Sequence, residues 1–251
     1  MSTKHVFDDA TGLVEKACLG VASTNPDLRF FAHHKVLYNA AHPRDKVAIL
    51  AGGGAGHEPA FSGLVGSGLV TVAVSGDVFA SPSSKQICSG VDLAPTDKGI
   101  VTIVLNYTGD CLNFGLASEK ARSAFHSEGK GRDIEMVNVG DDVSVGRSKG
   151  GLVGRRGLTG AAFTAKVLGA ASEKGDDVQK IAHLGRTMVK NFVTVGSSLD
   201  HCHVPGRSTD PKERGALSQS AVEIGMGIHN EPGAKHIENK PSGEDLSLIH
   251  I

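Results

Sequence analysis

The stretch KVAILAGGGAGHEP, residues 46–59, decides the fold class that this sequence predicts. It begins with a short apolar run that is typical of a buried strand, and the run passes directly into glycines and His57-Glu58-Pro59. Three later runs share this format, each apolar and each ending in glycine and polar residues: residues 69–74, 100–105 and 134–139. We therefore expect four strands whose carboxyl ends carry polar loops.

Segments with the apolar spacing of helices lie before, between and after these runs, at residues 7–22, 112–125, 161–173 and 178–194. This alternation predicts an α/β fold with largely parallel or mixed sheets and flanking helices. Ligands of such folds bind at the carboxyl ends of the strands, where the polar loops are expected.

The character of the sequence changes after about residue 147, where a stretch rich in glycine and arginine begins. We take residues 1–145 as a first α/β subdomain. Residues 146–245 are taken as the start of a second, incomplete α/β subdomain with a strand-like run at 222–229. Residues 246–251 match no pattern and stay unassigned, with a non-native end as one interpretation.

The composition excludes several classes of protein. The 251 residues are 39% hydrophobic with a formal net charge of -1, too apolar for a disordered chain and too neutral for a general nucleic-acid binder. No apolar run is long enough for a secretory signal or a membrane span, so we expect a soluble cytoplasmic protein with no nucleic-acid or membrane partner. The four cysteines form no C-x-x-C pair and are expected to be buried free thiols: Cys18, Cys88, Cys111 and Cys202.

The glycine loop at residues 52–56 is the strongest local candidate for a ligand site. Consecutive glycines after a strand let the backbone approach a small ligand with its N–H groups turned inward. Neither the P-loop pattern nor the dinucleotide fingerprint is present, since His57 stands where the fingerprint requires its third glycine. The alternative is a tight turn that presents His57 as an exposed cap.

A second histidine follows glycines in the same way, in GMGIHNEPG at residues 225–233. A histidine at a strand end among glycines can act as a nucleophile or carry a proton. Either histidine alone is also compatible with a core residue bonded to a backbone carbonyl. Two loops that match in this way argue against the core interpretation for both His57 and His229.

Asp110 ends the segment NYTGD directly after a predicted buried strand. A carboxylate there can be a general base or the N-cap of the helix expected from Leu112, and the two roles can coexist. The segment DHCH at residues 200–203 is interpreted as a turn rather than a metal site. Arg155-Arg156 is interpreted as a solvated or salt-bridged pair rather than an anion site. No metal ligands are assigned.

Several motifs together resemble the substrate-binding (K) domain of dihydroxyacetone (glycerone) kinases, most closely the fungal ATP-dependent type. They occur in the order GGGAGHEP at 52–59, FASP at 79–82, NYTGDCLNF at 106–114, GRRG at 154–157 and GMGIHNEPG at 225–233. The resemblance covers residues 1–240. It implies a kinase that phosphorylates dihydroxyacetone, with glyceraldehyde as a further substrate.

The resemblance also implies roles for individual residues. His229 matches the histidine whose ring nitrogen adds to the ketone carbon and holds dihydroxyacetone as a hemiaminal, which glycerol cannot form. The loop Gly54, Ala55, Gly56 and His57 matches the part that binds the substrate, with His57 as a hydrogen-bonding or proton-transfer partner. Asp110 matches the carboxylate that activates the hydroxyl receiving the phosphate, so the implied catalytic residues are His229, His57 and Asp110.

Two positions depart from the family pattern. Leu105 stands where the family usually has a lysine that helps to hold the substrate, a change expected to weaken binding by about 1–3 kcal/mol. Ala55 stands where the loop commonly has serine, which removes one hydroxyl and keeps the backbone path.

The resemblance implies that much of the kinase lies outside this chain. The family K domain continues beyond residue 251, and in the ATP-dependent type a separate helical domain binds ATP and Mg²⁺ with closely spaced aspartates. This sequence has no D-x-D pattern. We therefore expect the chain to bind dihydroxyacetone and no cofactor, to need the ATP-binding domain as a partner, and to be inactive with ATP alone. Family members also suggest a homodimer.

Two other functions stay open. One is a stand-alone K subunit that takes phosphate from a separate phosphoryl donor protein. The other is a non-catalytic carbonyl-binding or regulatory protein, a reading that Leu105 favours.

Overall fold

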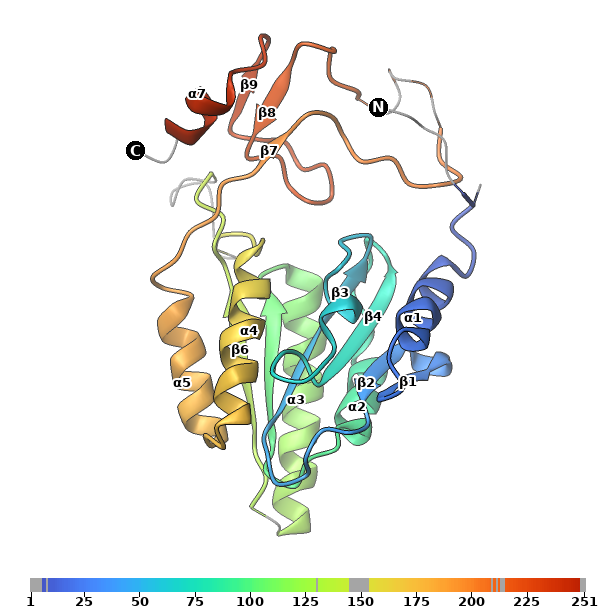
Figure 1. Cartoon of the computed structure of the whole chain (residues 1–251), viewed down its shortest axis with the longest axis vertical. Coiled ribbons are helices and arrows are strands. Elements are labelled where there is room, and N and C mark those ends of the chain that lie inside the picture. The colour runs from blue at the N-terminus through green and yellow to red at the C-terminus, as the bar shows by residue number, and fades with distance from the viewer. Residues whose placement is uncertain are drawn as a thin grey trace.

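The apolar runs of the sequence form a six-stranded sheet in the larger part of the molecule (Figure 1). We analysed a computed structural model, which describes residues 6–7, 9–129, 131–144, 154–208, 210, 212 and 215–248. The strand order is β1-β2-β4-β3-β5-β6, with β3, β4, β5 and β6 parallel and β1 and β2 antiparallel at one edge. The strands are β1 (Leu28–Phe31), β2 (Val36–Asn39), β3 (Ala48–Ala55), β4 (Val72–Val78), β5 (Ile100–Leu105) and β6 (Ile134–Val139). The predicted mixed α/β class is therefore confirmed.

Strands β5 and β6 have the predicted bounds, whereas β3 and β4 differ from the prediction. β3 continues through the glycines to Ala55, so the predicted glycine loop is largely a strand. Glycine is required there because a Cβ on Gly52 would lie 2.3 Å from the carbonyl oxygen of Val74 on the neighbouring strand. β4 begins three residues later than predicted, and β1 and β2 were not predicted.

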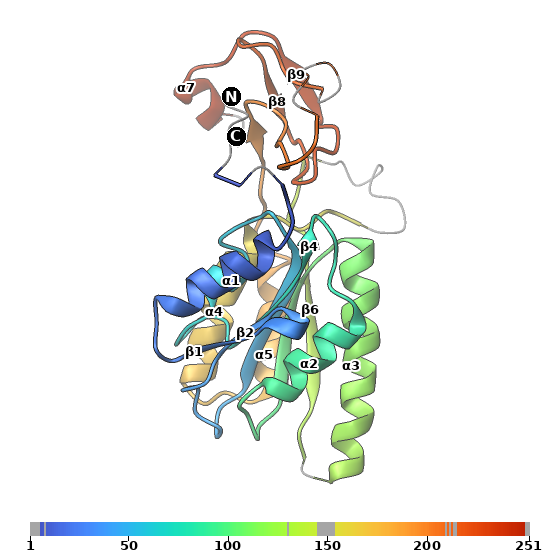
Figure 2. The same ribbon diagram turned by 90° about the vertical axis from the view of Figure 1, so that its right-hand side faces the viewer.

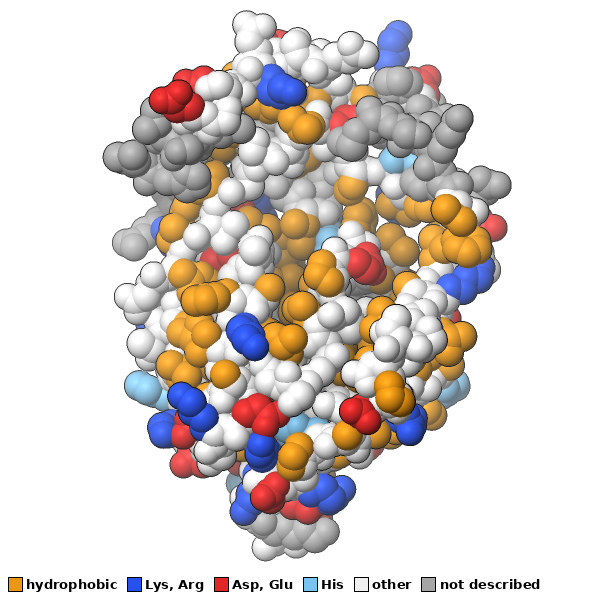
Figure 3. All heavy atoms as spheres, viewed as in Figure 1, with side chains coloured by type: hydrophobic (Ala, Val, Ile, Leu, Met, Phe, Trp, Pro, Cys, Tyr) orange, Lys and Arg blue, Asp and Glu red, His pale blue; other side chains and the backbone are white. Residues whose placement is uncertain are grey.

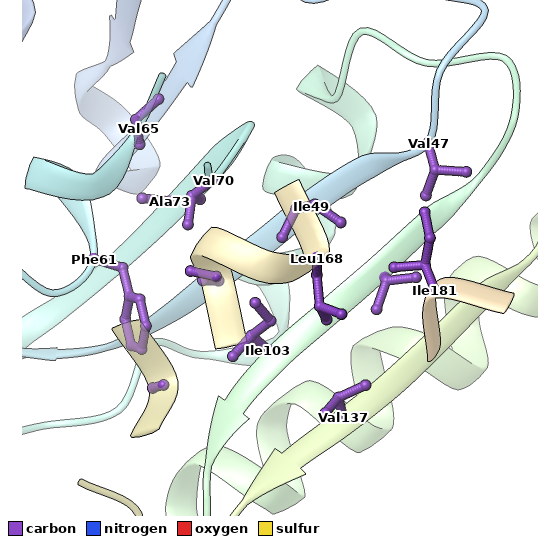
Figure 4. Packing of buried hydrophobic residues seen from close by; sticks show 14 of the residues in the cluster. Val47, Ile49, Phe61, Val65, Val70, Ala73, Ile103, Val137, Leu168 and Ile181 are labelled. Carbon is purple, nitrogen blue, oxygen red and sulfur yellow. The ribbon is translucent and has the colours of Figure 1, made fainter. Parts of the chain in front are cut away.

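Helices cover both faces of the sheet (Figure 2). Alternate residues of β3 face opposite layers: Ile49 packs with α4 and α5, and Leu50 packs with α2 and α3. Figure 4 shows Ile49, Ile103 and Val137 of the sheet meeting Leu168 and Ile181 of the helices. The helices are α1 (Leu13–Ser23), α2 (Ser84–Leu93), α3 (Thr108–Glu128), α4 (Gly160–Glu173) and α5 (Val178–Met188), with short 3₁₀ turns η1 (Ala32–His34) and η2 (Ser62–Leu64).

Helices α4 and α5 belong to the core of the large sheet, although the sequence-based division at residue 145 assigned them to the second subdomain. Their apolar faces, including Leu168 and Ile181, are fully buried against the sheet. α3 begins four residues before the predicted start, and α5 ends at Met188 rather than at residue 194. Within the described part of the chain, no helix has the length and the apolar composition that crossing a membrane requires.

The smaller part of the molecule is an antiparallel sheet of β7 (Ser197–Ser198), β8 (Val222–Ile224) and β9 (Lys235–Ile237), followed by α7 (Gly243–Leu248) (Figure 1). The strand predicted at 222–229 ends at Ile224 because the next residue, Gly225, has φ +77 and leaves the extended conformation. The rest of the predicted strand forms the loop that carries His229. Residues 249–251 of the unassigned end, and residues 149–153 of the glycine- and arginine-rich stretch, lie outside the described residues.

Candidate active site

Residues from three segments distant in sequence meet at the carboxyl edge of the large sheet. His57 follows β3, and Asp110 lies in the first turn of α3, which follows β5. Because β3 and β5 are parallel neighbours, their carboxyl ends lie at the same edge. His229 comes from the loop between β8 and β9, which turns toward this edge in Figure 1.

The two predicted histidines contact each other directly. Nε2 of His57 lies 3.0 Å from Nε2 of His229, at hydrogen-bonding distance. Nδ1 of His229 lies 3.0 Å from Oε1 of Glu231, whose other oxygen accepts the backbone N–H of His229 at 2.9 Å. A carboxylate only accepts, so Nδ1 of His229 carries the proton and Nε2 keeps its lone pair. His57 therefore donates its Nε2–H to Nε2 of His229.

Aromatic rings surround the histidine pair. Phe79 stacks on His57 with ring centroids 5.0 Å apart and an interplanar angle of 15°, and its edge-on contact with His229 is 5.3 Å. Tyr107 meets His229 edge-on at 4.9 Å. Phe79 has φ +55, an unusual conformation for a bulky residue, which places its ring against His57.

Burial sets the protonation of the groups around the pair. Burial and, to a smaller extent, the nearby imidazole of His229 lower the pKa of His57 to about 4, so His57 is neutral at physiological pH. Burial tends to raise the pKa of Glu231, but the hydrogen bonds from the side chain and backbone of His229 outweigh it and leave that pKa below its ordinary value. The site therefore contains two histidines in contact, and the carboxylate of Glu231 is hydrogen-bonded to the second one, His229.

Asp110 is buried beside the pair, and the N-cap interpretation of this residue is wrong. The N-cap of α3 is Tyr107, and Asp110 lies inside the first turn. Burial raises the pKa of Asp110, and a hydrogen bond from Ser81 opposes this rise. Among the described residues, Oδ1 of Asp110 has no hydrogen-bond partner. A buried carboxylate oxygen without a partner is suited to accept a hydrogen bond from a ligand hydroxyl.

A small cavity lies between these groups and has a volume of about 10 Å³, room for roughly one water molecule. Of the predicted residues, Gly54, His57, Asp110 and His229 line it. Ala55 and Gly56 do not: Ala55 faces the other way along the strand and packs against Val14 and Cys18 of α1. Gly53 of the predicted glycine loop and Leu105, at the position of the family lysine, also line the cavity. The remaining lining residues were not predicted: Ala60, Phe61, Tyr107 and Ile228.

Arg156 holds the loop that carries His229 through a hydrogen bond to its backbone. The guanidinium donates to the carbonyl oxygen of Gly225 at 2.7 Å and to the fully buried carboxylate of Asp142 at 2.8 Å. This confirms the prediction of a salt-bridged arginine rather than an anion site for Arg156. Gly227 lets the loop close, because a Cβ there would lie 2.0 Å from Oε2 of Glu231.

Glu231 and Arg156 contact His229 and its loop, and the sequence analysis did not predict these contacts. Glu231 stands two residues after His229 in the quoted motif, so its spacing was a usable signal. The contact of Arg156 with Gly225 joins residues 69 positions apart. No local pattern reports such a contact.

The segment at residues 200–203 is a loop bound to the His229 loop. Oδ1 of Asn230 accepts from the backbone N–H of Cys202 at 2.8 Å and from its thiol at 3.0 Å, and Nδ2 of Asn230 donates to the Cys202 carbonyl at 3.1 Å. No three His, Cys, Asp or Glu side chains of the described segments are grouped as metal ligands require. All four cysteines are free, as predicted, but only Cys18 is buried, and Cys202 is exposed in the loop at residues 200–203.

An α/β sheet whose strand ends hold a histidine and an aspartate, covered by a loop with a second histidine, defines a small-ligand-binding domain of the α/β class. The chain belongs to the family described as the Dak1 domain, whose model matches residues 19–250.

Named relatives support this assignment. The dihydroxyacetone kinase of Pichia angusta is 43% identical over 256 residues, which span 98% of this chain and 41% of that protein. The crystal structure of the dihydroxyacetone kinase of C. freundii is 34% identical with a TM-score of 0.86, covering 100% of this chain and 44% of that one. The dihydroxyacetone kinase operon co-activator DhaQ is 30% identical with a TM-score of 0.82, over 93% of this chain and 68% of that one. This chain thus spans less than half of the kinases it matches.

Proposed function

We propose that this chain is the part of a dihydroxyacetone kinase that binds the phosphoryl acceptor, and that it holds dihydroxyacetone as a covalent hemiaminal on Nε2 of His229. The observation that carries the proposal is the hydrogen bond from His229 Nδ1 to Glu231, because it leaves a lone pair on Nε2. In this structure that lone pair accepts the hydrogen bond from His57, and both rings line the small cavity beside Asp110. The names of the related kinases indicate the ligand.

The proposed addition balances without a cofactor. The Nε2 lone pair of His229 forms a bond to the carbonyl carbon, and the π electrons of the C=O bond move onto its oxygen. The Nδ1 proton leaves through Glu231 to water, which restores the Glu231 carboxylate. The oxygen takes up one proton from water, so the adduct is neutral and no proton is gained or lost overall. His57 hydrogen-bonds the new hydroxyl through its Nε2–H. Glycerol has no carbonyl carbon to accept the attack.

Ligand entry requires the two imidazoles to part, because a three-carbon ketose is larger than the cavity between them. The Nε2–H that His57 gives to His229 in this structure is then free for the ligand oxygen. A terminal hydroxyl of the ligand would lie beside Asp110, which takes its proton as phosphate is transferred. The phosphoryl donor, ATP with Mg²⁺, would be bound by a separate helical domain rather than by these residues.

The test is carbon NMR with dihydroxyacetone labelled at the carbonyl carbon. The carbonyl signal should move to the region of saturated carbon in the unaltered chain, and His229→Ala should abolish the new signal while the fold is kept. His126→Ala is the matched control, because His126 lies on the exposed end of α3 far along the helix from Asp110. An adduct that persists in His229→Ala would overturn the proposal.

A second candidate function is regulatory binding of the same ligand without phosphoryl transfer. The similarity to the operon co-activator DhaQ favours it, because that protein shares the fold at 30% identity. The two candidates differ in Asp110: Asp110→Asn should keep the adduct in both. In a kinase supplied with its ATP-binding domain, the same variant should also lower phosphoryl transfer. Transfer that is absent in the unaltered completed protein would favour the regulatory function.

A further inference from the structure

An apolar cavity adjoins the candidate active site. Its volume is about 370 Å³, which is large compared with the small cavity between the histidines. Its walls are formed by the segment around η2, by the start of α4, by residues 194–198 and by the loop at 226–228. The face drawn in Figure 3 is hollowed between the two parts of the molecule, and hydrophobic side chains gather around this hollow.

The two cavities share part of their walls. They share the lining residues His57, Ala60, Phe61, Leu105 and Ile228. His57 is therefore a common wall, and it is also the ring that must separate from His229 to admit a ligand. A ligand bound at His229 consequently has the large cavity directly beside it.

The chemistry of the large cavity is that of an apolar pocket. Its walls continue from Leu105 to Leu64, Leu158 and Met226. Of the described residues that line it, none is Lys, Arg, Asp or Glu, and His57 is the one titratable group. Leu105 is nearly buried and places a hydrocarbon side chain where the two cavities meet. Such walls favour burial of a hydrocarbon group and offer no charge to a polar one.

We propose that this chain accepts hydroxymethyl ketones with an alkyl substituent, whose carbonyl carbon bonds to His229 and whose alkyl chain lies in the large cavity. The proposal rests on the proposed hemiaminal chemistry and extends its substrate class from a triose to 1-hydroxy-2-alkanones. The hydroxymethyl group remains beside Asp110, and the alkyl chain replaces the second hydroxymethyl group of dihydroxyacetone. The bond that forms and the protons that move are the same as for dihydroxyacetone.

The experiment measures dissociation constants for adducts of hydroxyacetone, 1-hydroxy-2-butanone, 1-hydroxy-2-pentanone and 1-hydroxy-2-hexanone, each labelled at the carbonyl carbon. Each methylene buried in an apolar site should tighten binding about fourfold, the equivalent of about 0.8 kcal/mol. The hemiaminal signal distinguishes covalent binding at His229 from loose association. Dihydroxyacetone is titrated in parallel as the reference.

A matched pair of variants locates the alkyl chain. Ala162 lies on α4, is exposed and lines the large cavity, so Ala162→Phe should fill part of it. We expect this variant to lose most of the increase in affinity that a longer alkyl chain gives, and to keep its affinity for hydroxyacetone. Lys166 lies one helical turn further on, is exposed and does not line the cavity. Lys166→Phe should bind all four ketones as the unaltered chain does.

The outcomes are separable. A dissociation constant that stays flat or rises with chain length in the unaltered chain overturns this inference, and adduct formation with dihydroxyacetone in the same experiment leaves the proposed function standing. Absence of any adduct, with dihydroxyacetone included, overturns both. If the affinity of the Ala162→Phe variant still increases with alkyl chain length, the alkyl chain lies elsewhere, and the inference is likewise overturned.

Discussion

His229 gains its proposed reactivity from one neighbour, Glu231. An imidazole in water exchanges its proton between two nitrogens, and only the form with the proton on Nδ1 leaves Nε2 free to attack. Glu231 holds that form by accepting from Nδ1, and it orients the ring through a second bond to the backbone of the same residue. The carboxylate acts through His229 and is therefore a positioning residue.

Removal of this carboxylate should weaken the adduct. A hydrogen bond to a charged group contributes about 1.5–3 kcal/mol, so Glu231→Ala should raise the dissociation constant for dihydroxyacetone about ten- to hundredfold. Glu231→Gln keeps an acceptor oxygen and should recover part of the loss. Carbon NMR titration measures both variants. Equal affinities of the alanine variant and the unaltered chain would show that Glu231 does not hold the tautomer.

His57 should make stability depend on pH in a defined window. Its pKa is about 4 in the folded chain because of burial and the nearby His229, against an ordinary value of 6.5. Between these values the unfolded chain binds the proton more readily than the folded chain, so the free energy of unfolding falls as pH is lowered from about 6.5 to about 4. His57→Gln should lose less stability over the same window. Urea unfolding at a series of pH values measures the difference, and parallel curves would contradict it.

At the scale of an element, β3 carries the site because its glycines fit where no other residue does. Gly52 pairs with Val74 of β4, and its missing side chain leaves room for a carbonyl oxygen. Gly54 is equally confined, since a Cβ there would lie 2.8 Å from the backbone nitrogen of Ala80. The glycines thus let β3 and the segment after β4 lie close together under His57.

Two glycine-to-alanine substitutions should therefore have opposite effects. Gly52→Ala forces a Cβ into backbone and should destabilise the fold by about 1–3 kcal/mol. Gly115 lies inside α3 with open space around its Cβ position, and Gly115→Ala should stabilise by about 1 kcal/mol through helix propensity. The free energy of unfolding in urea measures both. Destabilisation by Gly115→Ala would show that the space there is needed.

At the scale of the whole molecule, the site depends on the hydrogen bonds that join the smaller part, which carries His229, to the part with the large sheet. Arg156 bonds to Asp142, which follows β6, and to the carbonyl of Gly225 in the His229 loop. Asn230 bonds to Cys202 and links the same loop to the segment before β8. These bonds place a residue of one part against His57 of the other.

The arginine should matter for both stability and ligand binding. Arg156→Met leaves the buried carboxylate of Asp142 without its cationic partner, at a cost of about 3–5 kcal/mol in the free energy of unfolding. Adding Asp142→Asn to this variant removes the unpaired charge and should restore part of the stability. The dihydroxyacetone adduct should stay weak in both variants, because the Gly225 carbonyl has lost its donor. Full recovery of the adduct in the double variant would contradict a positioning role for Arg156.

Much of the fold could be predicted because local patterns report it. β5 and β6 are continuous apolar runs, and their bounds match the prediction. β1 is a short edge strand with two exposed positions, so its pattern is not a continuous apolar run. β2 lies between β1 and β4 and has only four residues, VLYN, a run too short to be recognised as a strand. The end of β8 depends on the conformation of Gly225, which glycine permits but does not dictate.

The order of amino acids by itself determined the α/β class, through alternating strand and helix patterns, and the two glycine-histidine loops with Asp110, through spacing along the chain. Only the tertiary structure decided that His57 and His229 share a hydrogen bond across 172 positions, that Ala55 and Gly56 do not line the small cavity, and that an apolar pocket adjoins the pair. The physical reason is that spacing reports neighbours along one element. Contacts between elements depend on which faces pack together, and that is settled by burial of the whole core.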